Sequence, residues 1–325
     1  MIEMKTQLDQ LKEMSTVVAD TGEFNEIRQY RPTSGTTNPS LILAASKKEE
    51  YQHLIQEAIL WGKQGKTRKE KLELTLDKLF INFGIEILKI IPGEVSTEVD
   101  ARLSFDVRSL IKKARHLIAL YEAAGIERKR ILIKLASTWE GIMAAKQLEK
   151  ESIRCNMTLL FSLHQAVACA KVRATLISPF VGRVLDWHKK HESAGLYIAS
   201  QDPGVKLVTS IYQYYKHEGI PTKIMAASFR NIDEILELAG CDLLTIAPHL
   251  LKELLVSNQP ISLKLSPEAA KNIKIGKVTM SEKKFRWALC ENQMASDKLY
   301  EGIRGFSQAM EELETTIAYH ANLHQ

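Results

Sequence analysis

The chain has 325 residues, of which 45% are hydrophobic and 26% are charged, the composition of an ordinary soluble globular protein. Its 44 lysines and arginines are interleaved with 39 aspartates and glutamates, so the net charge of +5 does not form the basic patch of a nucleic-acid-binding protein. No apolar run approaches the roughly 20 residues that a membrane-spanning helix requires, which argues against a membrane protein.

The cysteines and the first residues bear on the cellular compartment. Cys155, Cys169, Cys241 and Cys290 lie far apart and form neither a CxxC pair nor a Cys/His ligand spacing, so we expect reduced thiols and no metal site. Residues 1–14 predict a short amphipathic helix and lack the apolar core of a signal peptide. Together these features predict a cytoplasmic protein.

Short β-rich runs alternate with helical stretches between about residues 16 and 256. Eight runs are predicted as strands: 16–20, 35–41, 95–100, 131–138, 156–161, 174–180, 222–228 and 243–248. A helical stretch follows each run, and no hairpin signal joins two of them. This alternation predicts an α/β fold, a single (β/α)8 TIM barrel, with a doubly wound open sheet as the alternative architecture.

The pattern changes beyond the eighth strand. After one more helix, residues 257–277 predict a loop, and two further helices are expected from about residue 281 and from about 295 to 319. Apolar side chains at helical spacing in the last helix predict a packing stripe: Leu299, Ile303, Phe306, Met310, Leu313 and Ile317. We therefore expect one domain over residues 1–325, with the barrel at about 16–256, a helical extension at about 278–320, and extra helices at both ends.

The fourth run, residues 131–138, carries the most unusual side chain. Its apolar and β-branched residues are typical of a strand buried on both faces, yet Lys134 lies in the middle, on the face of Leu132 and Ala136. A buried ammonium is costly unless it is paired or neutralised, and the neutral amine is a nucleophile toward carbonyls. Two interpretations follow: a Schiff-base lysine, or a lysine that reaches solvent or joins a structural ion pair.

Other notable residues fall at the carboxyl ends of the predicted strands, where a barrel places its active site. They are Asp20, Asn38, Glu98, Asn156, Thr158, Ser178, Phe180, Arg183, Ser228 and Arg230. Each has a structural alternative, because a strand-end Asp or Asn commonly caps a turn and an arginine after a strand can be a surface charge. Their gathering on one rim, around one buried lysine, favours a catalytic site.

Two long motifs carry a resemblance to a known family. Residues 36–42 read Thr-Thr-Asn-Pro-Ser-Leu-Ile, and residues 131–142 read Ile-Leu-Ile-Lys-Leu-Ala-Ser-Thr-Trp-Glu-Gly-Ile. These stretches resemble the two signatures of the transaldolases. Residues 17–22, 96–102, 177–183 and 227–231 also match, in the same order and over nearly the whole chain.

The resemblance implies a class I aldolase mechanism on a (β/α)8 barrel, with Lys134 as the Schiff-base residue and with neither a metal nor an organic cofactor. The enzyme would transfer a dihydroxyacetone unit between sugar phosphates in the non-oxidative pentose phosphate pathway. Sedoheptulose 7-phosphate and glyceraldehyde 3-phosphate would give erythrose 4-phosphate and fructose 6-phosphate.

The resemblance also implies roles for the other residues. Asp20 would be the acid/base at the C4 hydroxyl, and Glu98 would transfer protons through a water positioned by Thr158. The substrate-binding residues would be Thr36, Asn38, Asn156, Ser178, Phe180, Arg183, Ser228 and Arg230. Of these, the two arginines, helped by Ser228, would hold the phosphate.

Three other functions were weighed against the transferase. A simple aldolase is disfavoured by Phe180, because the related fructose 6-phosphate aldolases are expected to carry a tyrosine there. A catalytically silent homologue would lack Lys134, Asp20 or Glu98, and all three are present. A nucleic-acid binder lacks support, since no basic patch with interleaved aromatic residues is found. The resemblance further implies a homodimer, with the last helices as candidate contacts.

Overall fold

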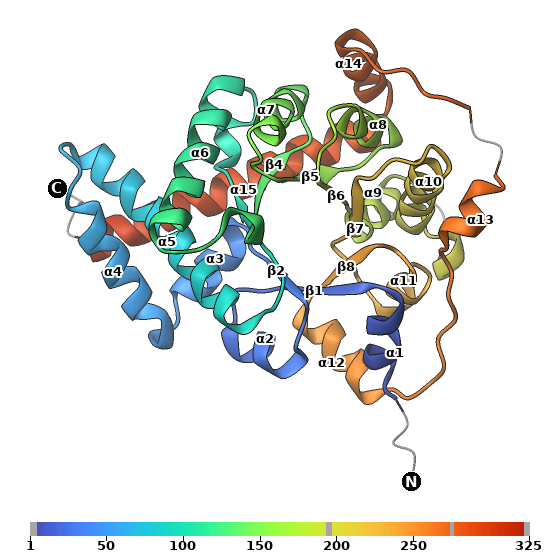
Figure 1. The fold of residues 1–325 in the computed structure, drawn as a ribbon, viewed down its shortest axis with the longest axis horizontal. Helices are drawn as coiled ribbons and strands as arrows, with labels where there is room; N and C mark the ends of the chain where they lie inside the picture. Colours follow the sequence, from blue (N-terminus) through green and yellow to red (C-terminus); the bar gives the residue numbers. More distant parts are fainter. Residues whose placement is uncertain (1–4, 193–196, 274–275, 322–325) are drawn as a thin grey trace.

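The computed structural model describes residues 5–192, 197–273 and 276–321. Within these ranges eight parallel strands pair in chain order, and the eighth pairs with the first, so that the sheet closes into a barrel (Figure 1). The predicted (β/α)8 barrel is confirmed and the open sheet is excluded. The strands are β1 (Thr16–Asp20), β2 (Ser34–Thr36), β3 (Val95–Glu98), β4 (Ile131–Ala136), β5 (Cys155–Leu160), β6 (Leu176–Pro179), β7 (Lys223–Ala226) and β8 (Leu243–Ile246).

Helices surround the barrel and extend it at both ends (Figure 1). In the described ranges the α-helices as far as β5 are α1 (Gln7–Met14), α2 (Phe24–Tyr30), α3 (Pro39–Ser46), α4 (Gln52–Gly62), α5 (Arg68–Ile90), α6 (Val107–Ala123) and α7 (Trp139–Lys150). The later ones are α8 (Leu163–Lys171), α9 (Gly182–His191), α10 (Pro203–His217), α11 (Ile232–Leu236), α12 (Pro248–Val256), α13 (Pro267–Lys271), α14 (Glu282–Glu291) and α15 (Gln293–His320).

The second strand is shorter than predicted. The run expected over residues 35–41 stops as a strand at Thr36, and α3 begins at Pro39. Asn38 ends the extended segment because its side-chain oxygen accepts a hydrogen bond from the N–H of Leu41, while Pro39 supplies a φ suited to the first helical turn. The third and fourth strands likewise end two residues earlier than the predicted runs, at Glu98 and Ala136.

The barrel interior divides into an apolar half and a polar half. Val18, Leu132, Leu176, Met225 and Leu243 form a small core of their own, separate from the large core between the sheet and its helices. In β4 the residues alternate as expected: Leu132 joins the interior cluster, whereas Ile131, Ile133 and Leu135 join the outer core. The polar half of the interior is therefore the half at the carboxyl ends of the strands.

The terminal helices lie against the barrel. The helix expected over residues 1–14 begins at Gln7, whose backbone N–H donates to the carbonyl of Ser257 at 2.6 Å, and residues 1–4 lie outside the described ranges. The predicted loop 257–277 contains the short α13; residues 274 and 275 are not described. The two predicted C-terminal helices are confirmed as α14 and α15.

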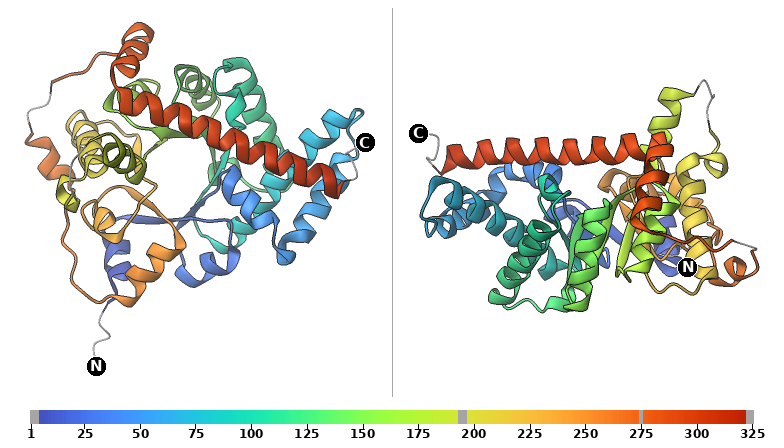
Figure 2. Two further views of the ribbon diagram at one scale, coloured as in Figure 1. Left: turned by 180° about the vertical axis from the view of Figure 1, so that it is seen from behind. Right: turned by 90° about the horizontal axis from the view of Figure 1, so that it is seen from above.

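Helix α15 crosses the face of the molecule that is turned away in Figure 1, and Figure 2 shows it as a long rod over the barrel. The stripe predicted to pack is buried throughout. Gly302 permits the close approach, since a Cβ there would lie 2.5 Å from Cδ2 of Leu159, at the end of β5.

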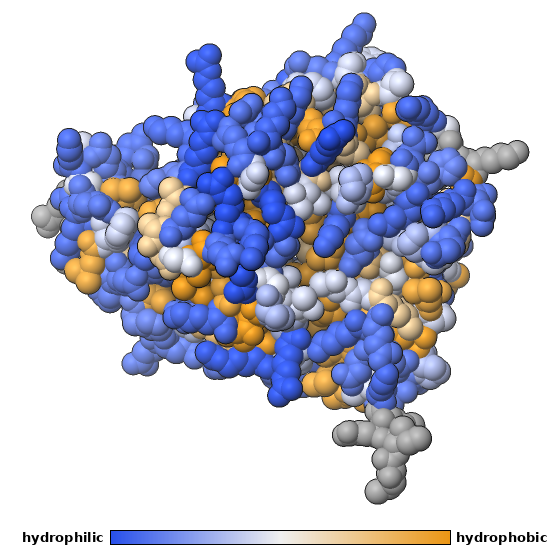
Figure 3. Space-filling model, in the orientation of Figure 1, coloured by the Kyte–Doolittle hydropathy of each residue, from blue (hydrophilic) through white to orange (hydrophobic). Residues whose placement is uncertain are grey.

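On the side away from α15, hydrophilic residues cover most of the surface and hydrophobic ones show between them (Figure 3).

Candidate active site

Lys134 lies inside the barrel with only 5% of its surface exposed. Its Nζ atom is 3.3 Å from Oε2 of Glu98 and 3.4 Å from the carbonyl oxygen of Thr37. Strand register explains this pairing, because Glu98 on β3 and Asn156 on β5 lie directly beside Lys134. Lys134 therefore forms an ion pair in which both partners are buried.

Asn156 organises a hydrogen-bonded row across neighbouring strands. Its Nδ2 donates to Oγ of Ser96 at 3.1 Å, and Ser178 donates its hydroxyl to Oδ1 of Asn156 at 2.6 Å. The buried hydroxyl oxygens of Thr36 and Thr158 have no hydrogen-bond partner among the described residues. Buried polar atoms normally have a partner, so these two hydroxyls are available to a substrate hydroxyl or a water.

The two carboxyl groups near Lys134 share an electrostatic environment. Burial raises the pKa of Asp20 and that of Glu98, while the positive charges of Lys134 and Arg183 oppose this rise. A carboxyl whose pKa lies above its usual range exchanges protons more readily near neutral pH. Asp20 and Glu98 are thus suited to act as proton donors and acceptors near Lys134.

A cavity of about 200 Å³ opens at the carboxyl end of the barrel. Nine of the predicted site residues line it: Asp20, Thr36, Asn38, Lys134, Ser178, Phe180, Arg183, Ser228 and Arg230. The other three, Glu98, Asn156 and Thr158, do not line it; they are buried on β3 and β5 beside the lysine strand. Asn38 has a structural role as well, since its Oδ1 caps α3.

Two arginines approach the cavity from different loops. The guanidinium of Arg183 lies 5.0 Å from the ring centre of Phe180 and 5.6 Å from that of Phe306, and none of the described carboxylates forms an ion pair with it. Burial and the nearby Arg230 lower the pKa of Arg183. Arg230 pairs with Asp186 at 2.6 Å. Two adjacent guanidinium groups favour an anion, and a phosphate matches their donor geometry.

Some residues of the site could not be found from the sequence. Phe306 was predicted only to pack; it packs, and it also lines the cavity. Asp186 and Ser96 gave no signal, because a charged residue on a helix and a serine in a strand are ordinary. His249, which follows β8 and lines the cavity, could have been found by the strand-end reasoning.

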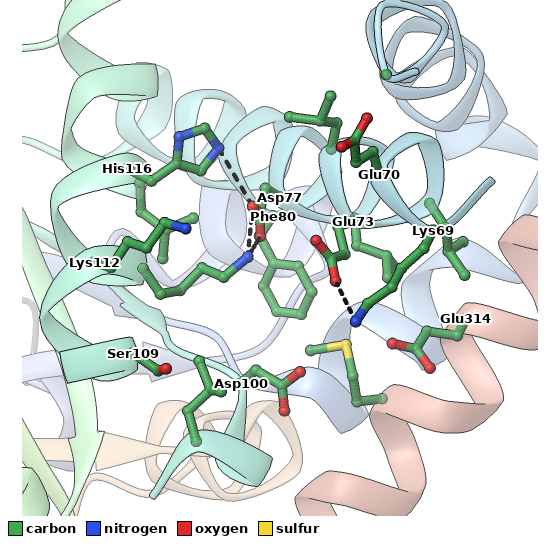
Figure 4. A pocket seen from close by; sticks show the side chains of 18 of the residues that line it. Lys69, Glu70, Glu73, Asp77, Phe80, Asp100, Ser109, Lys112, His116 and Glu314 are labelled. Atoms are coloured by element: carbon green, nitrogen blue, oxygen red, sulfur yellow. Dashed lines mark hydrogen bonds and ion pairs between the residues drawn. The ribbon is translucent and has the colours of Figure 1, made fainter. Parts of the chain in front are cut away.

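A larger hollow lies outside the barrel between α5, α6 and α15 (Figure 4). It measures about 910 Å³, and charged side chains of both signs line it, many of them paired. Asp77 pairs with Lys113 at 2.7 Å and with His116 at 3.4 Å. Glu98 lines this hollow, but Lys134, Arg183 and Arg230 do not. The barrel cavity is therefore the better candidate site.

The closed barrel and the position of the cavity place the chain among the (β/α)8-barrel enzymes, whose active sites lie at the carboxyl ends of the strands. The model of one family, transaldolase/fructose-6-phosphate aldolase, matches residues 17–317. The chain belongs to this family.

Similar curated proteins carry the name transaldolase. The protein of Protochlamydia amoebophila is 58% identical over 310 residues, which cover 95% of this chain and 96% of that protein. The Cricetulus griseus protein is 56% identical over 96% of this chain and 93% of its own length. For Thermosynechococcus vestitus the identity is 54%, over 96% of this chain and 81% of the relative.

Two kinds of feature are absent from the described residues. None of the helices there combines the length and apolar character needed to cross a membrane. The same part of the chain holds no group of three or more His, Cys, Asp or Glu side chains placed to bind a metal ion.

Proposed function

We propose that this chain is a transaldolase that carries a dihydroxyacetone unit from one sugar phosphate to another as an imine on Lys134. The observation that carries the proposal is the buried Lys134–Glu98 pair beside a cavity with two arginines in its wall. The lysine supplies a nucleophile for a ketose carbonyl, and the arginines supply a phosphate site at a distance from it.

The first stage forms the imine. Glu98 takes a proton from the ammonium of Lys134, and the neutral amine attacks the C2 carbonyl of the donor ketose. The resulting carbinolamine then loses water. Glu98 lies 3.3 Å from the lysine Nζ and transfers the protons of this dehydration, through a water that the unpartnered hydroxyl of Thr158 helps to position. Asn156, held by Ser96 and Ser178, and Thr36 and Asn38 bind hydroxyls of the three-carbon unit.

The second stage breaks and remakes a carbon–carbon bond. Asp20 accepts the proton of the C4 hydroxyl, the C3–C4 bond breaks, and the aldose phosphate leaves while the electron pair passes into the imine to give an enamine. The enamine then attacks the aldehyde carbon of the acceptor, and Asp20 returns the proton. Hydrolysis of the new imine releases the product ketose and frees Lys134.

The phosphate site fixes the substrate along the cavity. Arg183, Arg230 and Ser228 hold the phosphate of the donor and then that of the acceptor. The guanidinium of Arg230 forms an ion pair with Asp186. The substrate phosphate therefore competes with the Asp186 carboxylate for this guanidinium. Because both substrates carry the same group, one site serves both half-reactions.

A transfer assay tests the function and separates it from a simple aldolase. With fructose 6-phosphate and erythrose 4-phosphate, the proposal predicts sedoheptulose 7-phosphate and glyceraldehyde 3-phosphate in equal amounts. Free dihydroxyacetone should stay at background level. Release of free dihydroxyacetone at the rate of fructose 6-phosphate cleavage would contradict the transferase and establish an aldolase.

We further propose that residues 1–325 form one domain, that the protein is cytoplasmic, and that it forms a homodimer. Exposed aromatic residues on the last helices, Trp287 and Tyr300, support the dimer, and Phe105 lies with its ring centre 6.2 Å from that of Tyr300. Exposed aromatic side chains are common at interfaces between subunits. Sedimentation at micromolar concentration should give twice the chain mass; a monomer would refute the dimer.

A further inference from the structure

Two buried carboxyl groups lie behind the proposed phosphate site and have no part in the chemistry above. Asp202 is 2% exposed and Glu234 is 0% exposed, and their side chains are within hydrogen-bonding distance of each other. Oε1 of Glu234 is buried and accepts no hydrogen bond from a donor among the described residues. A pair of this kind has a steep electrostatic cost unless a proton lies between the two groups.

Each carboxyl also holds a segment of backbone. Oδ1 of Asp202 accepts the N–H groups of Gly204 and Val205, at 2.7 and 3.2 Å, and so caps the start of α10. Oε2 of Glu234 accepts the backbone N–H of Arg230 at 2.7 Å. The pair therefore ties the first turn of α10 to the loop that carries Arg230.

The segment that carries Arg183 contacts both the start of α10 and the loop of Arg230. A Cβ on Gly204 would lie 2.2 Å from the carbonyl oxygen of Val181, so the start of α10 is pressed against the residues just before Arg183. The N–H of Gly182 donates to the carbonyl of Ser228 at 2.7 Å. The loop of Arg230 is thus bonded directly to Glu234. The segment before Arg183 contacts both that loop and the start of α10, which Asp202 caps.

The charges around the pair are few. Burial is the main cause that raises the pKa of Glu234, to about 7, and Asp202 raises it further, while Arg230 from the adjoining loop opposes the rise. Burial also raises the pKa of Asp202, opposed by the N–H groups it caps and by Lys189 of α9. Arg230 and Lys189 are thus two described cations that act against the rise in the pKa values of the pair.

We infer that Asp202 and Glu234 share one proton and act as positioning residues, which hold Arg230 and Arg183 in place for the substrate phosphate. The inference rests on the proposed function. When the shared proton is lost, the two carboxylates repel each other, the hydrogen bond between them breaks, and the Arg230 loop loosens. Phosphate binding should therefore weaken as the pH rises, with no direct effect on Lys134.

Glu234→Gln is the matched test, because glutamine keeps both hydrogen bonds and has no proton to lose. Its amide nitrogen donates to Asp202, and its oxygen accepts the N–H of Arg230. The probe is inorganic sulfate as a competitor of fructose 6-phosphate, since sulfate stays a dianion over the whole range. In the unmodified protein the sulfate inhibition constant should rise roughly three- to tenfold between about pH 6 and about pH 8.5.

In Glu234→Gln the rise should be absent. His249 also lines the cavity, but it is unchanged in the variant, so its effect on sulfate binding is common to both proteins. Parallel pH profiles for the two proteins, with sulfate competing in both, would overturn this inference alone. Failure of sulfate to compete at any pH would overturn the phosphate site itself, and this inference with it.

Glu234→Ala gives an independent measurement. The change removes both hydrogen bonds, so the KM for fructose 6-phosphate should rise several-fold while kcat changes little. Asp202→Asn should preserve a low KM, since its amide can donate to Glu234. A fall in kcat with an unchanged KM in Glu234→Ala would contradict a positioning role at the phosphate site.

Discussion

Lys134 and Glu98 depend on each other for their burial. Each is an ion that has lost most of its water, and the 3.3 Å contact between them offsets part of that cost. Removal of one partner leaves the other charge buried and unpaired. The same pair thus bears on both the stability and the chemistry of the site.

Glu98→Gln should lower kcat by about a hundredfold, because the amide cannot transfer the protons of dehydration and hydrolysis. It should also destabilise the protein by roughly 2–4 kcal/mol, since a buried ammonium loses its counter-ion. Urea unfolding and steady-state kinetics measure both effects. The control is Glu73→Gln: Glu73 pairs with Lys69 at 3.8 Å and both side chains are mostly exposed, so its loss should change stability by less than about 1 kcal/mol.

Phe180 is the residue that separates transfer from hydrolysis in this account. It lines the cavity, meets Phe161 edge to face at 5.3 Å, and lies under Arg183. Phe180→Tyr places a hydroxyl beside the imine, where it can direct water to it. Release of free dihydroxyacetone from fructose 6-phosphate should rise; no increase in a direct aldolase assay would show that the ring only packs.

A site residue could be identified from the sequence where its type is unusual for its position, and could not where its type is ordinary. Lys134 interrupts an apolar strand, and Asp20 ends one, so both could be found in the sequence. Asp186 and Phe306 lie on helix faces where a charge or an aromatic ring is common. Only the fold brings Phe306 to the cavity and Asp186 to the guanidinium of Arg230. Asn38 lines the cavity as expected, and it also caps α3, which is the common structural role of an asparagine at the end of a strand.

Among the elements, α15 has the least predictable role. Its apolar stripe indicated a packed helix, but no pattern in residues 257–277 indicated that the chain returns across the carboxyl end of the barrel. Strand positions were predictable from apolar runs. Their ends were less so, because the end of β2 is set by a hydrogen bond from the backbone of Leu41 to Asn38.

Gly302→Ala tests how closely α15 must approach the barrel. The added Cβ would lie 2.5 Å from Cδ2 of Leu159, a buried side chain on a residue with φ of +53°, so it has little room to move. The variant should lose roughly 1–2 kcal/mol of stability and some activity, because Phe306 shifts with the helix. Thermal unfolding and kcat/KM are the measurements.

Gly305→Ala is the matched control on the same helix. A Cβ at Gly305 meets nothing within 4 Å, and the residue is exposed. This change should raise stability by about 0.5–1 kcal/mol through helix propensity alone, with activity unchanged. Equal effects of the two alanines would show that the approach of α15 to Leu159 is not tight.

At the scale of the whole molecule, the buried carboxyls with raised pKa values make one contribution to the pH dependence of stability. Burial raises the pKa of Glu234 from 4.5 to about 7, so over this interval the folded protein holds a proton that the unfolded chain has released. This group therefore makes the free energy of unfolding fall as the pH rises from about 4.5 to about 7. The raised pKa values of Asp20 and Glu98 act in the same direction.

Glu234→Gln should therefore gain stability relative to the unmodified protein as the pH rises. Between about pH 5 and about pH 8 the difference in unfolding free energy should shift by roughly 1–3 kcal/mol in favour of the variant. Denaturant unfolding at both pH values measures it. A difference that is the same at both would show that Glu234 ionises in the folded protein as readily as in the unfolded chain.

Borohydride trapping tests the central claim most directly, because reduction converts an imine into a stable secondary amine. The protein is incubated with fructose 6-phosphate, reduced, digested and mapped by mass spectrometry. We expect a dihydroxyacetone-sized adduct on the peptide that contains Lys134, and none in Lys134→Ala. An active, folded sample without this adduct, or with the adduct on another lysine, would contradict the mechanism.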